Sequence, residues 1–166
     1  MKVVPLPAWT ADGVLPPNNR ASPVSADRSP YAVALTDFVL RFGDSEPRQR
    51  ILDGLLRYRR ALHTVGLTSG VQWLSGSFLE QIEDLESRPP NDVDVVTFYR
   101  LPAQTSQRDL LESAPRLFPV DLTTKLQIKE KFSVDGYLVH LGTEPERLTE
   151  EAAYWYSVWS HRRNGL

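Results

Sequence analysis

Apolar side chains recur at helical spacing between about Ser45 and Val65, where they share one face of a predicted helix. Ser45 is suited to cap this helix, Pro47 falls in its first turn, and Gly66 follows its last periodic position. Four arginines occupy the opposite face: Arg48, Arg50, Arg57 and Arg60. Such a set is more typical of a solvated helix face than of a phosphate or nucleic-acid site. The pattern therefore predicts one long amphipathic helix.

Three segments farther along the chain have the composition of β-strands: residues 71–75, 92–99 and 132–141. Each is rich in valine, leucine or aromatic residues and is bounded by glycine, proline or charge. Helical patterns lie between them, over residues 78–86, 106–114 and 121–129. Because strands and helices alternate in this way, the sequence predicts an α/β (α+β) fold with a small mixed β-sheet.

A last helix is predicted over about residues 149–163, with acids in its first turn and basic residues at its end. Trp155 and Trp159 lie one turn apart on a single face of it. Core packing is the favoured role of this pair, and a partner-docking face is the alternative.

The first 30 residues contain six prolines and no apolar period of either kind, which predicts an extended, proline-rich N-terminal arm. Packing of this arm around the domain is favoured over a role in binding a partner. The remaining residues, 31–166, are expected to form one domain.

Composition narrows the classes of function. The 19 basic and 21 acidic side chains give a formal net charge of −2, so the chain lacks the basic excess of a typical nucleic-acid binder. The absence of cysteine excludes disulfides, thiolate nucleophiles and sulfur-ligated zinc. No signal-peptide pattern and no run of 18 apolar residues is present, so we expect a soluble, cytoplasmic protein that does not enter a membrane.

The candidate chemistry begins where the first strand runs into Gly76 and Ser77. A glycine-serine turn that feeds a helix presents backbone N–H groups to an anionic phosphate, and the serine adds a hydroxyl donor. After fourteen residues come Asp92 and Asp94, which project from the same side of the second strand because side chains alternate. Two such carboxylates, about 7 Å apart along the strand, can share a magnesium ion.

A third acid, Asp135, interrupts the otherwise apolar third strand. An isolated carboxylate there is costly to desolvate, so it should have a cation or a hydrogen-bond donor as partner. A metal held jointly with Asp92 and Asp94 would supply one. Lys125, Lys129 and Lys131 precede this strand, and a solvated helix face is favoured for them over contact with a triphosphate.

In this order, Gly76-Ser77, Asp92-Val93-Asp94 and Asp135 resemble the motifs of the DNA polymerase beta-like nucleotidyltransferase superfamily. The resemblance covers about residues 45–140 and is greatest to minimal, single-domain bacterial members associated with toxin–antitoxin or phage-defence operons. The spacing between Ser77 and Asp92 is long for this superfamily. We therefore expect an extended helix after the glycine-serine turn, or a loop at residues 88–90.

The resemblance implies the nucleotidyltransferase fold, with the three acids at one edge of a sheet face and the helices packed on the other face. It also implies that Asp92 and Asp94 bind two Mg²⁺ or Mn²⁺ ions, that Asp135 assists the attacking group, and that Gly76 and Ser77 hold the nucleotide phosphates. The implied reaction transfers a nucleoside monophosphate from a nucleoside triphosphate (NTP) to a hydroxyl. The acceptor stays open: a tRNA or a protein, and also a nucleotide or an antibiotic.

A second hypothesis is an inactive nucleotidyltransferase fold that serves as an antitoxin or assembly subunit, with an operon-encoded partner or as a homo-oligomer. The small size of the chain and the Trp155/Trp159 face motivate this hypothesis.

Overall fold

A three-stranded sheet with the strand order β1-β2-β3 forms the centre of the fold in the computed structural model, which describes residues 5–161. The strands are β1 (Gly70–Ser75), β2 (Val93–Tyr99) and β3 (Val134–His140). β1 and β2 are antiparallel, whereas β2 and β3 are parallel, so the sheet is mixed. The predicted fold class and the three predicted strands are confirmed.

The helices of the described chain are α1 (Leu35–Phe42), α2 (Glu46–Thr64), α3 (Ile82–Glu86), α4 (Gln107–Ser113), α5 (Leu122–Phe132) and α6 (Pro145–Trp159). Two short 3₁₀ helices, η1 (Ser77–Leu79) and η2 (Pro115–Leu117), lie between them. The long helix after Ser45 is confirmed as α2. The helix expected over residues 78–86 is divided into η1 and α3, and the chain then runs through residues 87–92 without helix or strand, as the long spacing predicted.

Two differences from the predicted helices stand out. α1 was not predicted. α6 begins four residues before the expected start at Thr149, because Pro145 occupies its first turn and Glu144 is its N-cap. The predicted end of that helix, at residue 163, lies outside the described residues.

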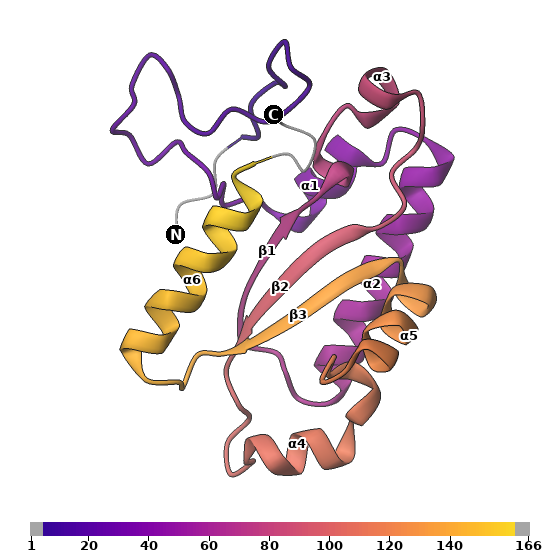
Figure 1. The fold of residues 1–166 in the computed structure, drawn as a ribbon, viewed down its shortest axis with the longest axis vertical. Helices are drawn as coiled ribbons and strands as arrows, with labels where there is room; N and C mark the ends of the chain where they lie inside the picture. Colours follow the sequence, from indigo (N-terminus) through magenta and orange to yellow (C-terminus); the bar gives the residue numbers. More distant parts are fainter. Residues whose placement is uncertain (1–4, 162–166) are drawn as a thin grey trace.

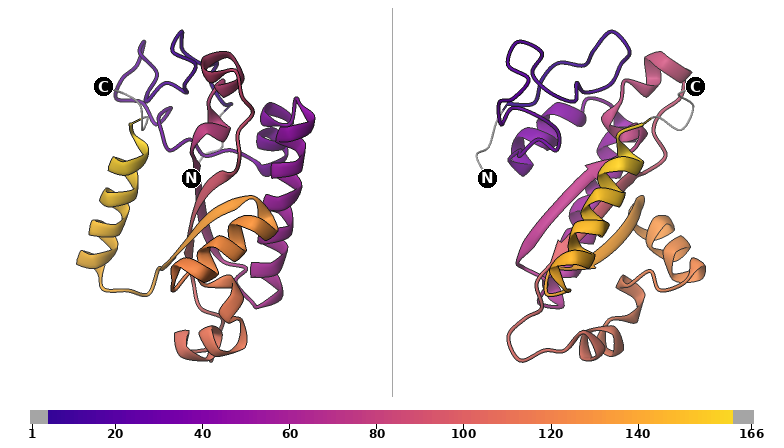
Figure 2. Two further views of the ribbon diagram at one scale, coloured as in Figure 1. Left: turned by 45° about the vertical axis from the view of Figure 1, so that its right-hand side comes forward. Right: turned by 60° about the vertical axis from the view of Figure 1, so that its left-hand side comes forward.

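Helices cover both faces of the sheet (Figures 1 and 2). α2 and α5 pack on one face, where Val93, Val95 and Val134 join the larger core. α6 packs on the other face, where Trp155 joins a smaller core with neighbours that include Val96. The expectation that helices cover one face only is therefore wrong: the Trp155/Trp159 side of α6 supplies the apolar partner that the second face needs.

Arg48 corrects the prediction of four solvated arginines on α2, because its side chain is only 2% exposed. Its guanidinium donates to Glu83 Oε1 and Oε2 at 2.7 and 2.8 Å and to the carbonyls of Phe78 and Glu80 at 2.7 and 2.6 Å. A buried arginine is tolerated when its donors are satisfied in this way. Arg48 thereby fixes the segment that follows Gly76 and Ser77 to α2.

The N-terminal arm folds against the same segment. Trp9 Nε1 donates to the Leu79 carbonyl at 2.7 Å, and the Gln81 N–H donates to the Gly13 carbonyl at 2.9 Å. The guanidinium of Arg41 lies 3.8 Å from the centre of the Trp9 ring. The described part of the arm thus packs around the domain, beyond the end of the sheet at which β1 ends (Figure 1). None of the helices in the described part of the chain combines the length and apolar character needed to cross a bilayer.

Candidate functional site

Gly76 lies in direct contact with the carboxylate of Asp94. β1 ends at Ser75, which pairs with Asp94 of β2, and Gly76 then turns the chain into η1. The φ angle of Gly76 is +86°, a conformation that L side chains rarely adopt. A Cβ atom at this position would lie only 2.0 Å from Asp94 Oδ2. The glycine is therefore required both for the turn and for the close approach of the carboxylate.

Asp94 and Asp135 lie side by side on neighbouring strands, because Asp94 of β2 is the register partner of Asp135 of β3. Residues in this register are about 5 Å apart and point to the same face of a sheet. That face is the one covered farther along by α6, since Val96 and Val139 belong to the smaller core. The structure thus brings Asp135 to Asp94, as the sequence predicted.

Asp92 lies two residues before Asp94, immediately before β2, and its Oδ2 atom is buried. Lys129 of α5 forms an ion pair with this oxygen. Asp92 raises the pKa of Lys129 through this hydrogen bond, and the charges of Asp135 and Asp94 add to the increase. Because Asp92 and Asp94 are two residues apart and Asp94 is in register with Asp135, the three acids lie at the same end of the sheet.

Asp135 has a cation partner, as its burial requires. It is 7% exposed, and its Oδ1 atom lies 3.1 Å from the ammonium of Lys125. The same ammonium donates to the Tyr137 hydroxyl and lies 4.4 Å from the centre of the Tyr137 ring. Burial lowers the pKa of Lys125, but the bonds to Tyr137 and Asp135 outweigh it and raise the pKa overall. The cation expected at Asp135 is thus present, and it is a lysine.

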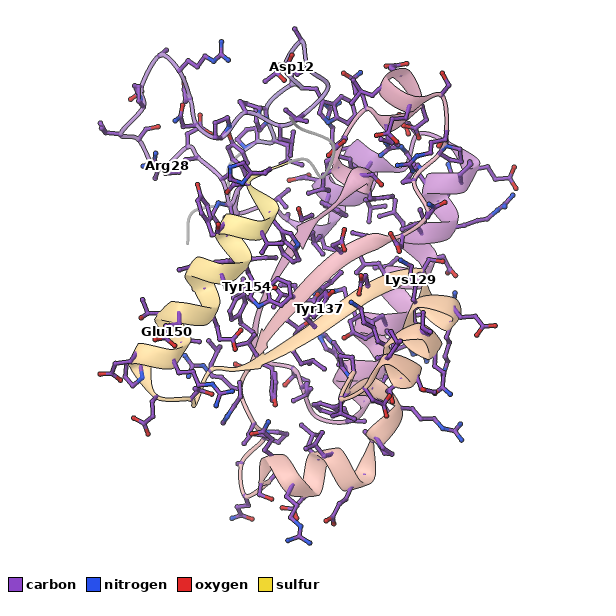
Figure 3. The ribbon with its side chains drawn as sticks, in the orientation of Figure 1. Asp12, Arg28, Lys129, Tyr137, Glu150 and Tyr154 are labelled. Carbon is purple, nitrogen blue, oxygen red and sulfur yellow. The ribbon has the colours of Figure 1, made fainter. Side chains whose placement is uncertain are left out.

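The structure corrects the preferred role of two lysines. Lys125 and Lys129 were expected on a solvated helix face, yet both contact the acids that the sequence singled out. Figure 3 shows Lys129 at the end of α5 beside the start of β3, with Tyr137 farther along that strand. The signal in the sequence was their spacing of four residues just before the strand of Asp135, which places both on one side of a helix.

The donor chemistry of the cluster suits a hard divalent cation. Magnesium and manganese prefer carboxylate oxygens, and three carboxylates lie at this end of the sheet, two of them paired with lysines. Within residues 5–161, however, no group of three or more acid or histidine side chains is already arranged as a metal site. Asp92 and Asp135 are instead each paired with a lysine of α5.

The segment that follows Gly76 and Ser77 is held by hydrogen bonds from two sides. Ser77 is the first residue of η1, which is too short to act as an anion site by its dipole alone. The two residues after Ser77 are held from two sides: Arg48 of α2 donates to the Phe78 carbonyl, and Trp9 of the arm donates to the Leu79 carbonyl. Gly76, Ser77 and the three acids therefore occupy one end of the sheet, with the backbone of the turn preorganised next to Asp94.

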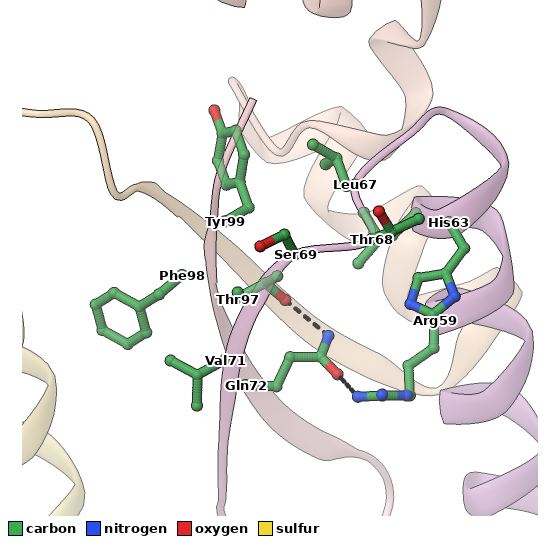
Figure 4. A pocket seen from close by; sticks show the side chains of 12 residues that line it. Arg59, His63, Leu67, Thr68, Ser69, Val71, Gln72, Thr97, Phe98 and Tyr99 are labelled. Carbon is green, nitrogen blue, oxygen red and sulfur yellow. Dashed lines mark hydrogen bonds between the residues drawn. The ribbon is translucent and has the colours of Figure 1, made fainter. Parts of the chain in front are cut away.

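A separate hollow of about 130 Å³ lies between α2 and the other end of β1 and β2 (Figure 4). Arg59 donates to the side-chain Oε1 of Gln72, and Gln72 Nε2 donates to Thr97 Oγ1 at 2.8 Å. These polar groups satisfy one another, and no acid or predicted site residue lines the hollow. The acid cluster is consequently the stronger candidate for chemistry.

The chain belongs to the family described as "Family of unknown function (DUF6932)", which matches residues 7–166. No curated protein and no solved structure matches the chain significantly.

Proposed function

We propose that this member of the DUF6932 family is a metal-dependent nucleotidyltransferase that transfers a nucleoside monophosphate from an NTP to a hydroxyl group. The observation that carries the proposal is the register of Asp94 with Asp135, with Asp94 also lying against Gly76. A cation-binding pair of acids and a phosphate-binding turn are expected at adjoining positions in such an enzyme, and these residues adjoin.

In the proposed reaction, Mg²⁺ or Mn²⁺ bound by Asp92, Asp94 and Asp135 would neutralise the charge that develops on the transferred phosphate. The backbone of Gly76 and the hydroxyl of Ser77 would contact the phosphates. Asp135 of β3, the most deeply buried of the three acids, would orient the attacking hydroxyl beside Asp94. The acceptor hydroxyl belongs to a tRNA or a protein in this proposal, and pyrophosphate leaves.

The proposal is tested by incubating the purified protein with each α-³²P-labelled NTP, Mg²⁺ or Mn²⁺, and cell extract as the source of acceptor. We expect a cation-dependent labelled product from the natural protein and none from the Asp92→Asn, Asp94→Asn double variant. The matched control is Asp12→Asn, Glu150→Gln, which removes two exposed acids far from the cluster (Figure 3). Equal labelling by the two double variants would rule out a role for the acids in catalysis.

A second candidate function is that of a noncatalytic partner subunit, an antitoxin or assembly subunit. Two observations favour it: Asp92 and Asp135 already have lysine partners, and α6 leaves Tyr154, Tyr156 and Val158 exposed at its surface. The Trp155/Trp159 pair does not contribute to such a surface, because Trp155 is buried against Tyr137. Copurification with an operon-encoded protein, together with no NTP binding in calorimetry, would support this function over the first.

A further inference from the structure

The two lysines of the acid cluster differ in how firmly they are held. Lys125 and Lys129 lie one turn apart on α5, and β3, the strand next to α5, is at the edge of the sheet. Both side chains therefore reach the acids around this edge. Lys125 is held by Asp135 and by Tyr137, and its side chain is 30% exposed. Lys129 is 44% exposed, and Asp92 is its only ion-pair partner among the described residues.

The acids need positive charge whether or not a metal is bound. Asp92 Oδ2 and Asp135 Oδ1 are buried from solvent, so leaving either one charged and without a cation would be costly. In the described structure the lysines supply that charge. A divalent cation bound to Asp92 would occupy the position of the Lys129 ammonium and would repel it, because like charges at such a distance interact unfavourably.

From this difference we infer that Lys129 is an exchangeable counter-ion: it occupies Asp92 until a divalent cation displaces it, and it then binds a phosphate of the incoming NTP. Lys125 stays with Asp135 and Tyr137 during the exchange. The inference rests on the proposed function for the identity of the nucleotide. In this inference Lys129 is a phosphate-binding residue, and it becomes available to the triphosphate only when the cation has bound.

The exchange is feasible because the side chain of Lys129 is flexible and 44% exposed. A lysine side chain has four rotatable bonds, and the partly exposed ammonium of Lys129 can turn from Asp92 to solvent without disturbing α5, which is anchored by buried Ile128 and Phe132. The released ammonium then lies at the rim of a site that holds a metal-bound polyphosphate, where a second positive charge is favourable.

The test uses Mn²⁺ alone and Mn²⁺ with a nonhydrolysable NTP analogue. Mn²⁺ binding is followed by electron paramagnetic resonance and analogue binding by calorimetry, in the full-length protein and in Lys129→Met. We expect the substitution to tighten binding of Mn²⁺ alone by about 3- to 10-fold, since a competing charge is removed. We expect it to weaken binding of the Mn²⁺-bound analogue by about tenfold, since a charge-assisted hydrogen bond is lost.

Lys131→Met is the matched control, because Lys131 is an exposed lysine of α5 that lies over the ring of Phe132 and has no ion pair with the acids. It should leave both affinities unchanged. Lys129→Gln, which keeps a polar side chain without the charge, should reproduce the tighter Mn²⁺ binding. Circular dichroism confirms that each variant is folded.

The outcomes separate the two proposals. If both Lys129 variants bind Mn²⁺ no more tightly than Lys131→Met, the exchange is wrong even where the natural protein turns over NTP. If Mn²⁺ binds more tightly but the analogue is unaffected, Lys129 competes with the cation and the phosphate contact is wrong. If Mn²⁺ binds more tightly and no NTP is turned over, the counter-ion role stands and the nucleotidyltransferase proposal fails.

Discussion

Two clusters of ion pairs lie beside the segment that follows Gly76, and they differ in how completely their charged groups are buried and hydrogen-bonded. In the first, Arg48 directs its donors to Glu83 and to two backbone carbonyls and is 2% exposed. In the second, Lys125 pairs with Asp135 and Lys129 with Asp92, and the two lysine side chains are 30% and 44% exposed. The first arrangement satisfies a buried cation, whereas the second places partly exposed cations on buried carboxylate oxygens.

This contrast teaches that the same residue types serve stability in one place and binding in another. Removing a buried, fully bonded arginine leaves backbone carbonyls without their donors and opens a cavity in the core. Removing a partly exposed lysine from a pair costs less, because water can reach the acid from the side that the lysine leaves. Substitutions in the two clusters should therefore have opposite balances of effect on stability and on ligand binding.

The largest effect on stability is expected for Arg48→Met. The substitution removes the partner of Glu83 and the donors to the Phe78 and Glu80 carbonyls, so we expect a loss of about 3–5 kcal/mol in the free energy of unfolding. Urea denaturation measures it. Arg50→Met is the control, since Arg50 is 71% exposed in its pair with Glu46 and should change stability by less than about 0.5 kcal/mol. Similar midpoints for the two variants would show that Arg48 is not structural.

Gly76→Ala should affect both stability and the site. The positive φ and the contact with Asp94 predict a loss of about 1–3 kcal/mol, and the displaced carboxylate predicts loss of NTP turnover. Gly142→Ala is the control: Gly142 is exposed, has no positive φ, and would meet only the side chain of His140. Denaturation and turnover are measured on both variants. A Gly76→Ala protein with natural stability and activity would contradict the close approach described for Asp94.

The pair of Arg48 and Glu83 should make stability depend on pH in the acid range. The hydrogen bond from Arg48 lowers the pKa of Glu83 below its ordinary value of 4.5. The pair therefore contributes fully above pH 4.5, and the contribution disappears as the pH falls through the lowered pKa. Glu83→Gln should be less stable than the natural protein at pH 7, and the two should converge in acid. The measurement is urea denaturation of both proteins at several pH values. A stability difference that stays constant with pH would contradict the role given to the Arg48–Glu83 pair.

The smallest effect on stability is expected in the acid cluster. Lys129→Met removes a pair in which the lysine is 44% exposed but Asp92 only 14%, so the free energy of unfolding should fall by about 1–2 kcal/mol, less than for Arg48→Met. Thermal denaturation of this variant beside Arg48→Met gives the direct comparison. Equal destabilisation by the two substitutions would mean that both clusters are structural.

The sequence was most informative where local pattern decides the outcome. The apolar period of α2 and the valine-rich strands depend on nearby residues, and both were predicted from the sequence. α1 was missed because its eight residues have Ala34 at the N-cap, with no side-chain cap. The start of α6 was misplaced because Thr149, although a suitable cap by residue type, lies within the helix.

What the sequence could not show depends on contacts between distant segments. Arg48 has the type and spacing of a solvated residue, and only the folding of α3 against α2 brings Glu83, 35 residues away, to it. The roles of Lys125 and Lys129 depend on α5 lying beside the edge strand. The register of Asp94 with Asp135 depends on the parallel pairing of β2 with β3, which no local pattern specifies.

The central claim is that Asp92, Asp94 and Asp135 act as one site for a divalent cation. The most direct test is a Mn²⁺ titration, followed by electron paramagnetic resonance, of the natural protein, Asp94→Asn, Asp135→Asn and the control Asp12→Asn. We predict that each of the two site substitutions weakens binding at least about tenfold, whereas the control leaves it unchanged. Natural Mn²⁺ affinity in Asp135→Asn would contradict the claim, because the acids of β2 and β3 would then not share a cation.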